Sequence, residues 1–309
     1  MSEFIADLRS DTVTRPCAAM KQAMVDAELG DDVLGDDPTV RQLEVTVAGM
    51  AGKEAALFLP SGTQSNLVAL MAHCERGDEY IVGQEAHTYK YEGGGAAVLG
   101  SIQPQPLDFE PDSTLDLLKV EAKIKSHDSH FARTRLLCLE NTRSGDVLPL
   151  EYHGQAQSFC VERGLGLHLD GARLFNACIK QGVELPAIAR HYDTVSLCLS
   201  KGLGAPAGSV LAGSAELVAR ARRWRKVLGG GLRQSGMLAA AGLYALQHNV
   251  ARLAEDHANA LRLAESLAQV PGITCDPDSV QTNMVFAIID DPSQALSLIH
   301  ISEPTRHSC

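Results

Sequence analysis

Two side chains near the middle of the chain have the types and the spacing to share one chemical task. Lys201 closes a run of apolar and β-branched residues (193–199) and precedes a Gly-Leu-Gly turn. Asp170 closes a second short apolar run (164–169). The runs predict two buried strands, and the separation of the two residues, about 30 positions, is the length of one strand–helix–strand unit. Parallel strands would bring both side chains to the carboxyl edge of a sheet, where open α/β sheets bind ligands.

An amine and a carboxylate at that edge match the two groups that bound pyridoxal 5'-phosphate (PLP) requires. The lysine would hold the cofactor through a Schiff base, and the aspartate would keep the pyridine nitrogen protonated so that the ring accepts electrons. Two plainer interpretations stay open at this point. Lys201 could be a solvated loop residue, or Lys201 and Asp170 could form a structural salt bridge between strand ends.

A turn further upstream predicts a site for the phosphate of such a cofactor. Gly62 and Thr63 lie between a predicted strand (55–59) and a predicted helix (64–73). Backbone N–H groups at a helix start have no partner within the helix and attract anions. The plainer alternative is a capped helix start without a ligand.

Two histidines could move protons near this edge. His87 follows a predicted strand (79–82), where an imidazole could stack on an aromatic cofactor or exchange protons, although a loop histidine with structural partners is the plainer interpretation. His130 lies in a polar loop.

The order of the predicted elements indicates an α/β fold. Strands and helices alternate from 55 to 211, which predicts a doubly wound, mostly parallel sheet. A glycine-rich loop and a short strand are predicted over 93–100, and a smaller second domain with a strand at 283–289 follows from 274. Further helices are predicted at 18–27, 39–52, 114–125, 152–163, 215–227, 237–246 and 249–270.

The composition excludes several classes of function. The chain has 309 residues, 45% of them hydrophobic, and a formal net charge of −11, which argues against nucleic acid and anionic membrane surfaces as partners. The basic segment 220–226 is interpreted as a solvated or subunit-contacting helix face. We expect no signal peptide and no membrane span. Eight cysteines without a C-x-x-C pair predict reduced thiols in a cytoplasmic protein.

The acidic segment 30–38 holds four aspartates that could bind a hard cation. It lacks the spacing of an EF-hand loop. A solvated turn before a helix is therefore the favoured interpretation.

Six motifs in the same order resemble the low-specificity L-threonine aldolases. The resemblance covers residues 5 to about 296 and implies a PLP-dependent transferase-like fold (fold type I), with a mostly parallel, seven-stranded-type sheet in a large domain and a smaller α/β C-terminal domain, here incomplete. It also implies a homotetramer, a dimer of dimers with active sites at the dimer interface. The motifs are DLRSDTVT (7–14), GDDVLGDDP (30–38), LPSGTQ (59–64), HLDGAR (168–173), LSKGLG (199–204) and GGGLRQS (229–235).

The resemblance assigns a role to each matching residue. Lys201 would bind PLP covalently, Asp170 would pair with the pyridinium nitrogen, and His87 would stack on the ring. The phosphate would be held by Gly62, Thr63, Ser200 and Arg233, the last from a neighbouring subunit. Ser10 and Arg173 would contact the substrate carboxylate, with Arg173 also close to the cofactor, and His87 and His130 would lie near the substrate β-hydroxyl. No metal ligand is implied.

The activity implied is PLP-dependent retro-aldol cleavage of L-threonine or L-allo-threonine, a small amino-acid substrate, to glycine and acetaldehyde. Two alternatives stay open: another lyase of fold type I that eliminates a β-substituent, and a truncated PLP-binding protein with little turnover.

Two departures from the family accompany the expected domain division. Leu34 replaces the usual aromatic residue of the GDDV motif. The tail 297–309 does not match the family and resembles translated adapter sequence, so we expect the region carrying a second arginine for the substrate carboxylate to be missing. The expected parts are an arm (1–40), a large PLP-binding domain (41–245), an incomplete small domain (246–296) and the tail.

Overall fold

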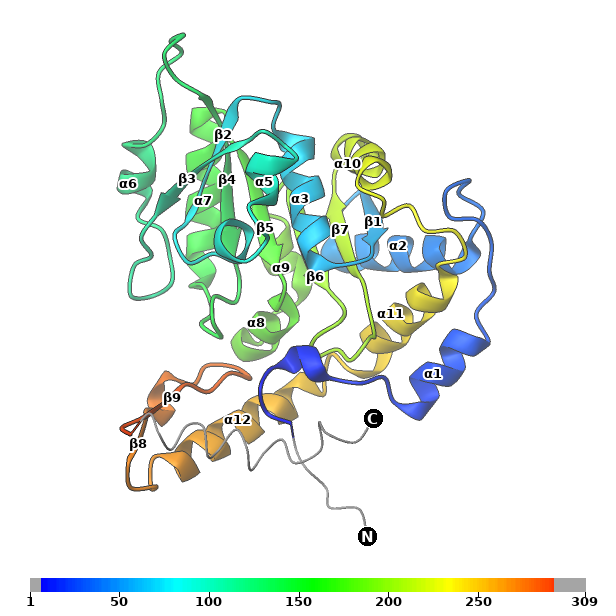
Figure 1. Ribbon diagram of the computed structural model, residues 1–309, viewed down its shortest axis with the longest axis vertical. Coiled ribbons are helices and arrows are strands. Elements are labelled where there is room, and N and C mark those ends of the chain that lie inside the picture. The colour runs from blue at the N-terminus through cyan, green and yellow to red at the C-terminus, as the bar shows by residue number, and fades with distance from the viewer. Residues whose placement is uncertain (1–6, 292–309) are drawn as a thin grey trace.

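A seven-stranded sheet forms the centre of the molecule in this computed structural model, which describes residues 7–291 (Figure 1). The strand order is β1-β7-β6-β5-β4-β2-β3. Only β7 runs antiparallel to its neighbours, β1 and β6, and the other pairs are parallel. The predicted α/β class and mostly parallel sheet are therefore confirmed. The strands are β1 (Ala55–Leu59), β2 (Asp78–Gly83), β3 (Gln103–Leu107), β4 (Arg133–Glu140), β5 (Gly166–Gly171), β6 (Thr194–Cys198) and β7 (Ser209–Gly213).

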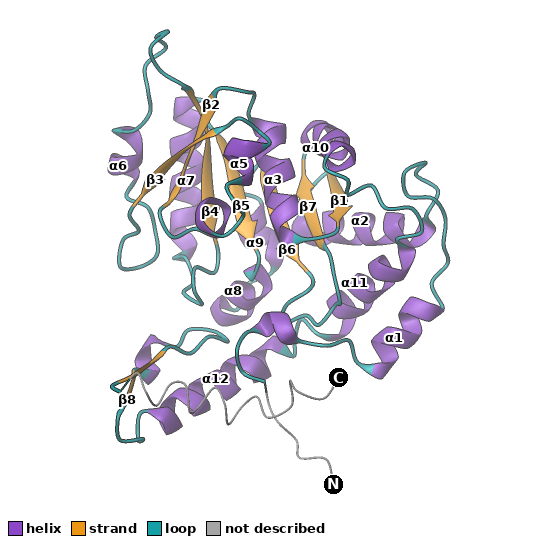
Figure 2. Cartoon of the chain, viewed as in Figure 1, coloured by secondary structure: helices purple, strands orange, loops and turns teal. Residues whose placement is uncertain are grey.

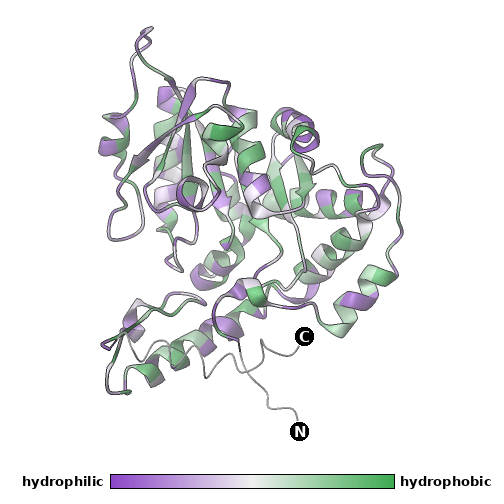
Figure 3. Cartoon of the chain, viewed as in Figure 1, coloured by the Kyte–Doolittle hydropathy of each residue, from purple (hydrophilic) through white to green (hydrophobic). Residues whose placement is uncertain are grey.

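The inner strands are buried on both faces, which explains their nearly continuous apolar sequences. Every residue of β2, β6 and β7 is buried. Figure 3 shows hydrophobic colouring concentrated on the central strands and hydrophilic colouring on outward helix faces. The polar residues at the ends of these strands, such as Asp170 at 2% exposure, therefore need partners of their own.

Helices cover both faces of the sheet, as Figure 2 shows. On one face, α3 and α10 pack together over β1 and β7. On the other, α2, α7, α8, α9 and α11 contribute to the largest apolar cluster. The bounds are α2 (Pro38–Ala51), α3 (Gly62–His73), α7 (Leu150–Arg163), α8 (Leu174–Gln181), α9 (Leu185–Ala189), α10 (Ala215–Val227) and α11 (Gly236–His248).

The N-terminal arm and the C-terminal segment both lie beyond the carboxyl ends of the strands (Figure 1). The arm contains the short helix η1 (Asp11–Val13) and α1 (Ala18–Val25), which packs on α11. The C-terminal segment contains α12 (Leu253–Leu267), η2 (Pro277–Ser279) and the antiparallel pair β8 (Ile273–Cys275) and β9 (Ala287–Ile289). The domain division stays a prediction, and the tail 297–309 lies outside the described residues.

Two local predictions were wrong, and one strand was not predicted. The segment 93–100 forms the short helix α5 (Gly95–Val98), not a strand, and the helix predicted at 114–125 is reduced to α6 (Leu117–Glu121). The sequence also did not indicate β3, which reads Gln-Pro-Gln-Pro-Leu. Prolines are tolerated there because β3 is the edge strand of the sheet.

The acidic segment is less solvated than predicted. Asp37 accepts the N–H groups of Val40 (3.0 Å) and Gly236 (2.9 Å), and so joins the start of α2 to the start of α11. Asp32 lies 2.9 Å from Arg225, and both side chains are about 5% exposed or less. The basic helix α10 is thus tied to this segment through a buried arginine, so its predicted solvated face does not include Arg225. Among the described residues, no helix is both long and apolar enough to cross a membrane.

Candidate active site

The carboxyl edge of the sheet gathers most of the residues that the sequence singled out. Gly62 and Thr63 begin α3 directly after β1, and His87 begins the short helix α4 (His87–Lys90) after β2. Asp170 lies near the end of β5, and Lys201 follows β6. Since β1 runs in the same direction as the parallel strands, all of these positions meet at one edge.

Asp170 is held in one orientation by two hydrogen bonds. Its Oδ2 accepts from the amide nitrogen of Asn66 in α3 at 2.8 Å, and its Oδ1 accepts from the backbone N–H of Ala172 at 3.0 Å. A buried hydrogen-bond acceptor with a fixed orientation therefore stands at the end of β5.

Lys201 provides an amine at the carboxyl edge of the sheet. Its side chain is half-buried, and within residues 7–291 its Nζ forms no hydrogen bond or ion pair. Thr14 of the N-terminal arm donates to its backbone carbonyl at 2.7 Å. A structural salt bridge with Asp170, one of the plainer interpretations, is not formed, and the amine is available for chemistry.

His87 is anchored by two carboxylates. Its backbone N–H donates to Oε2 of Glu140 at 2.8 Å, and its Nδ1 lies 2.8 Å from Oε1 of Glu92. The bond to Glu92 raises the pKa of His87, while partial burial opposes this rise. Burial raises the pKa of Glu140 to about 7, an effect that the neighbouring charge of Asp170 reinforces. The site thus holds a carboxyl group that changes charge near neutral pH, next to a histidine whose pKa lies above its ordinary value.

The start of α3 lies against the end of β6. Ser61 caps the helix by accepting the N–H of Gln64, which leaves the N–H groups of Gly62 and Thr63 in the uncapped first turn. A Cβ on Gly62 would lie 3.9 Å from Sγ of Cys198, and that sulfur lies 3.5 Å from Oγ of Ser200. The predicted phosphate-binding residues of the two elements are therefore neighbours.

A buried hydroxyl in the same place has no partner. Oγ of Ser209, at the start of β7, would lie 3.5 Å from a Cβ on Gly62. No hydrogen-bond partner for this atom is present among the described residues. Unpartnered buried donors are uncommon and mark places where a ligand or water binds.

The N-terminal arm reaches Arg173, which follows β5. Arg173 forms two bonds with Asp11, Nε to Oδ2 at 2.8 Å and Nη2 to Oδ1 at 2.7 Å. Asn283 of the C-terminal segment donates to the same carboxylate at 3.1 Å. Ser10, next to Asp11, caps η1 by accepting the N–H of Thr12. Arg173 and Ser10 therefore lie together, with the arginine already paired.

Two predicted residues are not joined to this group by any contact in the described chain. His130 is 81% exposed and pairs with Asp128 in its own loop. Arg233 is 57% exposed and pairs with Asp31 at 2.9 Å. Their roles at the site therefore stay predictions.

The sequence did not single out Asn66, Glu92, Glu140 and Asp11, although all four contact predicted site residues. Glu140 gave the same signal as Asp170, an apolar strand that ends in a carboxylate, and the two residues are register partners on β4 and β5. The atoms of His87, Glu92 and Asp170 that could bind a metal ion lie within 4.8 Å of one another. Hydrogen bonds among these groups and Asn66 account for that closeness without a metal ion.

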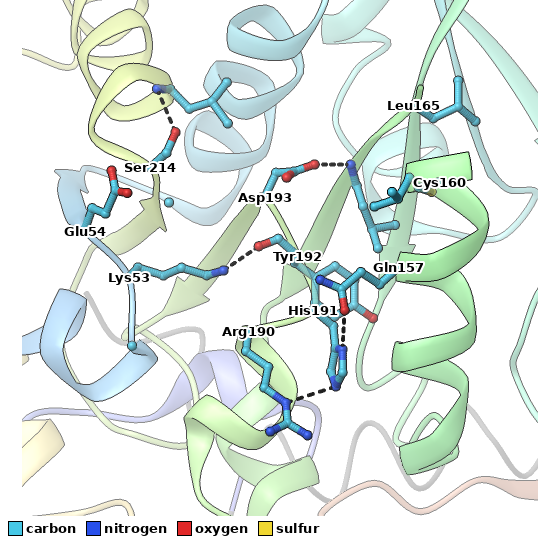
Figure 4. Close-up of a pocket in the computed structure, with 15 residues that line it drawn as sticks. Lys53, Glu54, Gln157, Cys160, Leu165, Arg190, His191, Tyr192, Asp193 and Ser214 are labelled. Carbon is cyan, nitrogen blue, oxygen red and sulfur yellow. Dashed lines mark hydrogen bonds between the residues drawn. The ribbon is translucent and has the colours of Figure 1, made fainter. Parts of the chain in front are cut away.

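A hollow in the described surface lies at the opposite, amino edge of the sheet (Figure 4). Its volume is about 340 Å³. Its polar groups bind each other: Lys53 donates to the carbonyl of Tyr192, and His191 binds both Gln157 and Arg190. Because these groups are already paired, the hollow is not the candidate active site.

The chain matches the family model described as beta-eliminating lyase over residues 7–290. It is 59% identical over 289 residues to the low specificity L-threonine aldolase of Escherichia coli strain K12, covering 94% of this chain and 86% of the relative. It is 49% identical over 294 residues to the low-specificity L-threonine aldolase 1 of Arabidopsis thaliana, covering 93% of this chain and 82% of that one.

Solved structures show the same fold. A threonine aldolase of Leishmania major superposes with a TM-score of 0.79 at 20% identity, covering 94% of this chain and 86% of that chain. A putative L-allo-threonine aldolase of Listeria monocytogenes gives a TM-score of 0.77 at 24% identity, covering 91% and 78%. The chain therefore belongs to the beta-eliminating lyase family and, within it, to the low-specificity L-threonine aldolases.

Proposed function

We propose that this protein cleaves L-threonine and L-allo-threonine to glycine and acetaldehyde, with PLP bound at the carboxyl edge of the sheet. One observation carries the proposal: the amine of Lys201, which has no hydrogen-bond or ion-pair partner among residues 7–291, stands at the same edge as the hydrogen-bonded carboxylate of Asp170, in a chain 59% identical to a named aldolase. These are the two groups that a fold type I cofactor site needs.

The residues at this edge fit the cofactor. Lys201 would carry it covalently, and Asp170 would keep its ring nitrogen protonated. The free N–H groups of Gly62 and Thr63, with Ser200, suit a phosphate at the start of α3. The unpartnered hydroxyl of Ser209 is a further donor there. When bound, PLP supplies the electron sink for cleavage of the Cα–Cβ bond.

The β-hydroxyl proton must be removed for that bond to break, and His87 is the base that we favour. Its ring lies beside Asp170 and Lys201, whose charges act on it. The bond to Glu92 uses Nδ1, so Nε2 is the nitrogen that can take a proton. The alternative base is His130, or a water held by the two histidines. This alternative requires movement of the loop 127–131.

The substrate carboxylate is proposed to bind Arg173 and Ser10. A guanidinium already paired with Asp11 keeps a fixed orientation, and its remaining N–H groups can donate to a second carboxylate. The side chain of Arg173 is 13% exposed. This partial burial strengthens its contact with a substrate carboxylate.

Self-association as a homotetramer is part of the proposal, with Arg233 reaching the phosphate of a neighbouring subunit. Large apolar side chains exposed near the carboxyl edge support an interface there: Leu34 (71%), Tyr91 (60%) and Val227 (63%). A cytoplasmic location is also proposed. The seven described cysteines are free, as is usual in reducing compartments.

Product analysis tests the proposal. The purified protein with added PLP should convert L-threonine to acetaldehyde and glycine in equal amounts. Release of ammonia and a 2-oxo acid instead would identify a β-eliminating lyase, and absence of both from a folded, PLP-loaded sample would refute turnover of threonine.

A further inference from the structure

Besides Asp170 and Glu140, the candidate active site holds a third buried carboxyl group, Glu92, which lies against the proposed base His87. The side chain of Glu92 is 4% exposed and lies just after α4. Its Oε1 is 2.8 Å from Nδ1 of His87 and 2.9 Å from Nδ2 of Asn66. Burying a carboxylate is costly unless its partners are well placed, so this position needs an explanation.

The amide of Asn66 is shared between two carboxylates. The same Nδ2 that donates to Glu92 also donates to Oδ2 of Asp170 at 2.8 Å. Both amide hydrogens are then used, and Oδ1 of Asn66 can only accept. It lies 3.3 Å from Nε2 of His168, which must therefore be the donor.

The buried residues behind Asn66 fix which atom donates in each hydrogen bond of this series. With Nε2 of His168 protonated, its Nδ1 accepts from the hydroxyl of Thr194 at 2.8 Å. The oxygen of Thr194 in turn lies 2.8 Å from Nε2 of His73. Burial lowers the pKa of His168 to about 3 and that of His73 to about 4. Both rings are therefore neutral, and each can donate one hydrogen bond and accept another. Every donor in this series points toward the two carboxylates.

The carboxylate of Glu92 fixes the ring of His87. Within residues 7–291, Nδ1 is the only ring nitrogen of His87 that forms a hydrogen bond. A proton held on Nδ1 by a buried carboxylate leaves Nε2 as an acceptor, the tautomer that a base requires. The other charged groups that face the ring are Asp170 and Lys201, and Glu140 binds the backbone N–H.

We infer that Glu92 is a positioning residue of the reaction: it holds the imidazole of His87 in the Nδ1-protonated tautomer, and Asn66 ties this pair to Asp170. The inference rests on the proposed function only for the role of His87 as a base. Through Asn66, the carboxylate proposed to hold the cofactor ring, Asp170, and the carboxylate that holds His87, Glu92, share one hydrogen-bond donor.

The first test is an NMR titration of His87 in the folded protein without PLP. Glu92→Gln keeps the shape of the side chain but removes its charge, so the titration midpoint of His87 should fall. Glu92→Asp keeps the charge at a greater distance and should give a smaller fall. The matched control is Glu85→Gln, whose carboxylate pairs with exposed Lys90, and it should change nothing. An unchanged midpoint in Glu92→Gln would overturn the inference.

The second test uses the PLP-loaded enzyme. Glu92→Gln should lower kcat about 10- to 100-fold with little change in KM, because the ring is misplaced but substrate binding remains. In a His87→Asn background the same change should have no further effect, and a further fall in kcat would show that Glu92 does not act through His87. If the wild-type enzyme itself cleaves no threonine, the proposed function fails, while the titration still decides the contact between Glu92 and His87.

Discussion

The guanidinium of Arg173 and the carboxylate of Asp11 form a two-bond ion pair, with donor–acceptor distances of 2.8 and 2.7 Å. The pair joins residues from the N-terminal arm and the end of β5, 162 positions apart. Asn283 adds a third segment to the same carboxylate. The arm is therefore held against the carboxyl edge of the sheet, beside the candidate active site, by a mostly buried charge pair.

Removing Asp11 should destabilise the protein. Although burial opposes ionisation, Arg173, Asn283 and Lys201 hold the pKa of Asp11 below its ordinary value. Asp11→Ala would leave Arg173 buried without a counter-charge, and the free energy of unfolding should fall by about 3 kcal/mol. Chemical denaturation measures this change. Glu121→Ala, which removes an exposed partner of Arg163, should cost less than about 1 kcal/mol; equal losses in the two variants would show that the Asp11 pair does not stabilise the fold.

Sequence reasoning found the strands that carry the cofactor-binding residues because their apolar runs are long and end in residues of distinct chemistry. Asp170, Lys201 and Gly62 all lie at such strand ends. It failed for β3, where prolines conceal an edge strand, and for α5, where two glycines precede the helix and a third begins it. It also missed Asn66 and Glu92, because their importance depends on contacts across 26 and 104 positions of sequence that only the packed fold creates.

Replacing Glu140 should change how stability depends on pH. Its pKa in the folded protein is about 7, above the ordinary 4.5, because burial and Asp170 disfavour its charge. A raised pKa means that its contribution to stability is fully present below pH 4.5 and is lost as pH rises through about 7. Glu140→Gln should therefore gain stability relative to wild type over that range, by roughly 3 kcal/mol in total. Denaturation of the PLP-free protein at pH 4.5 and pH 8 checks this, and parallel stability curves would contradict it.

Removing Arg225 should destabilise the acidic segment before α2. Its Nη1 donates to the carbonyl of Phe58 at 2.8 Å and lies 2.9 Å from Asp32. Arg225→Met would leave Asp32 buried without its counter-charge, so the free energy of unfolding should fall by about 3–5 kcal/mol. Arg222→Met is the neighbouring control, since that side chain is 42% exposed, and a similar loss there would argue against a special role for the buried pair.

The two candidate bases should differ in their effects on turnover. His87→Asn removes a ring that lies beside Asp170 and Lys201, so kcat should fall about 100-fold or more while PLP affinity changes little. His130→Asn alters an exposed loop and should lower kcat less, with no change in stability. Steady-state kinetics and PLP titration separate these effects. The reverse order, with His130→Asn the more damaging change, would make His130 the base.

The central claim is that Lys201 carries PLP. Borohydride reduction of the PLP-loaded protein, followed by mass spectrometry of its peptides, would show which amine holds the cofactor. We expect the cofactor mass on the peptide containing Lys201, and its loss in folded Lys201→Ala. Labelling of a different lysine, or no labelling of a folded wild-type sample, would contradict the account.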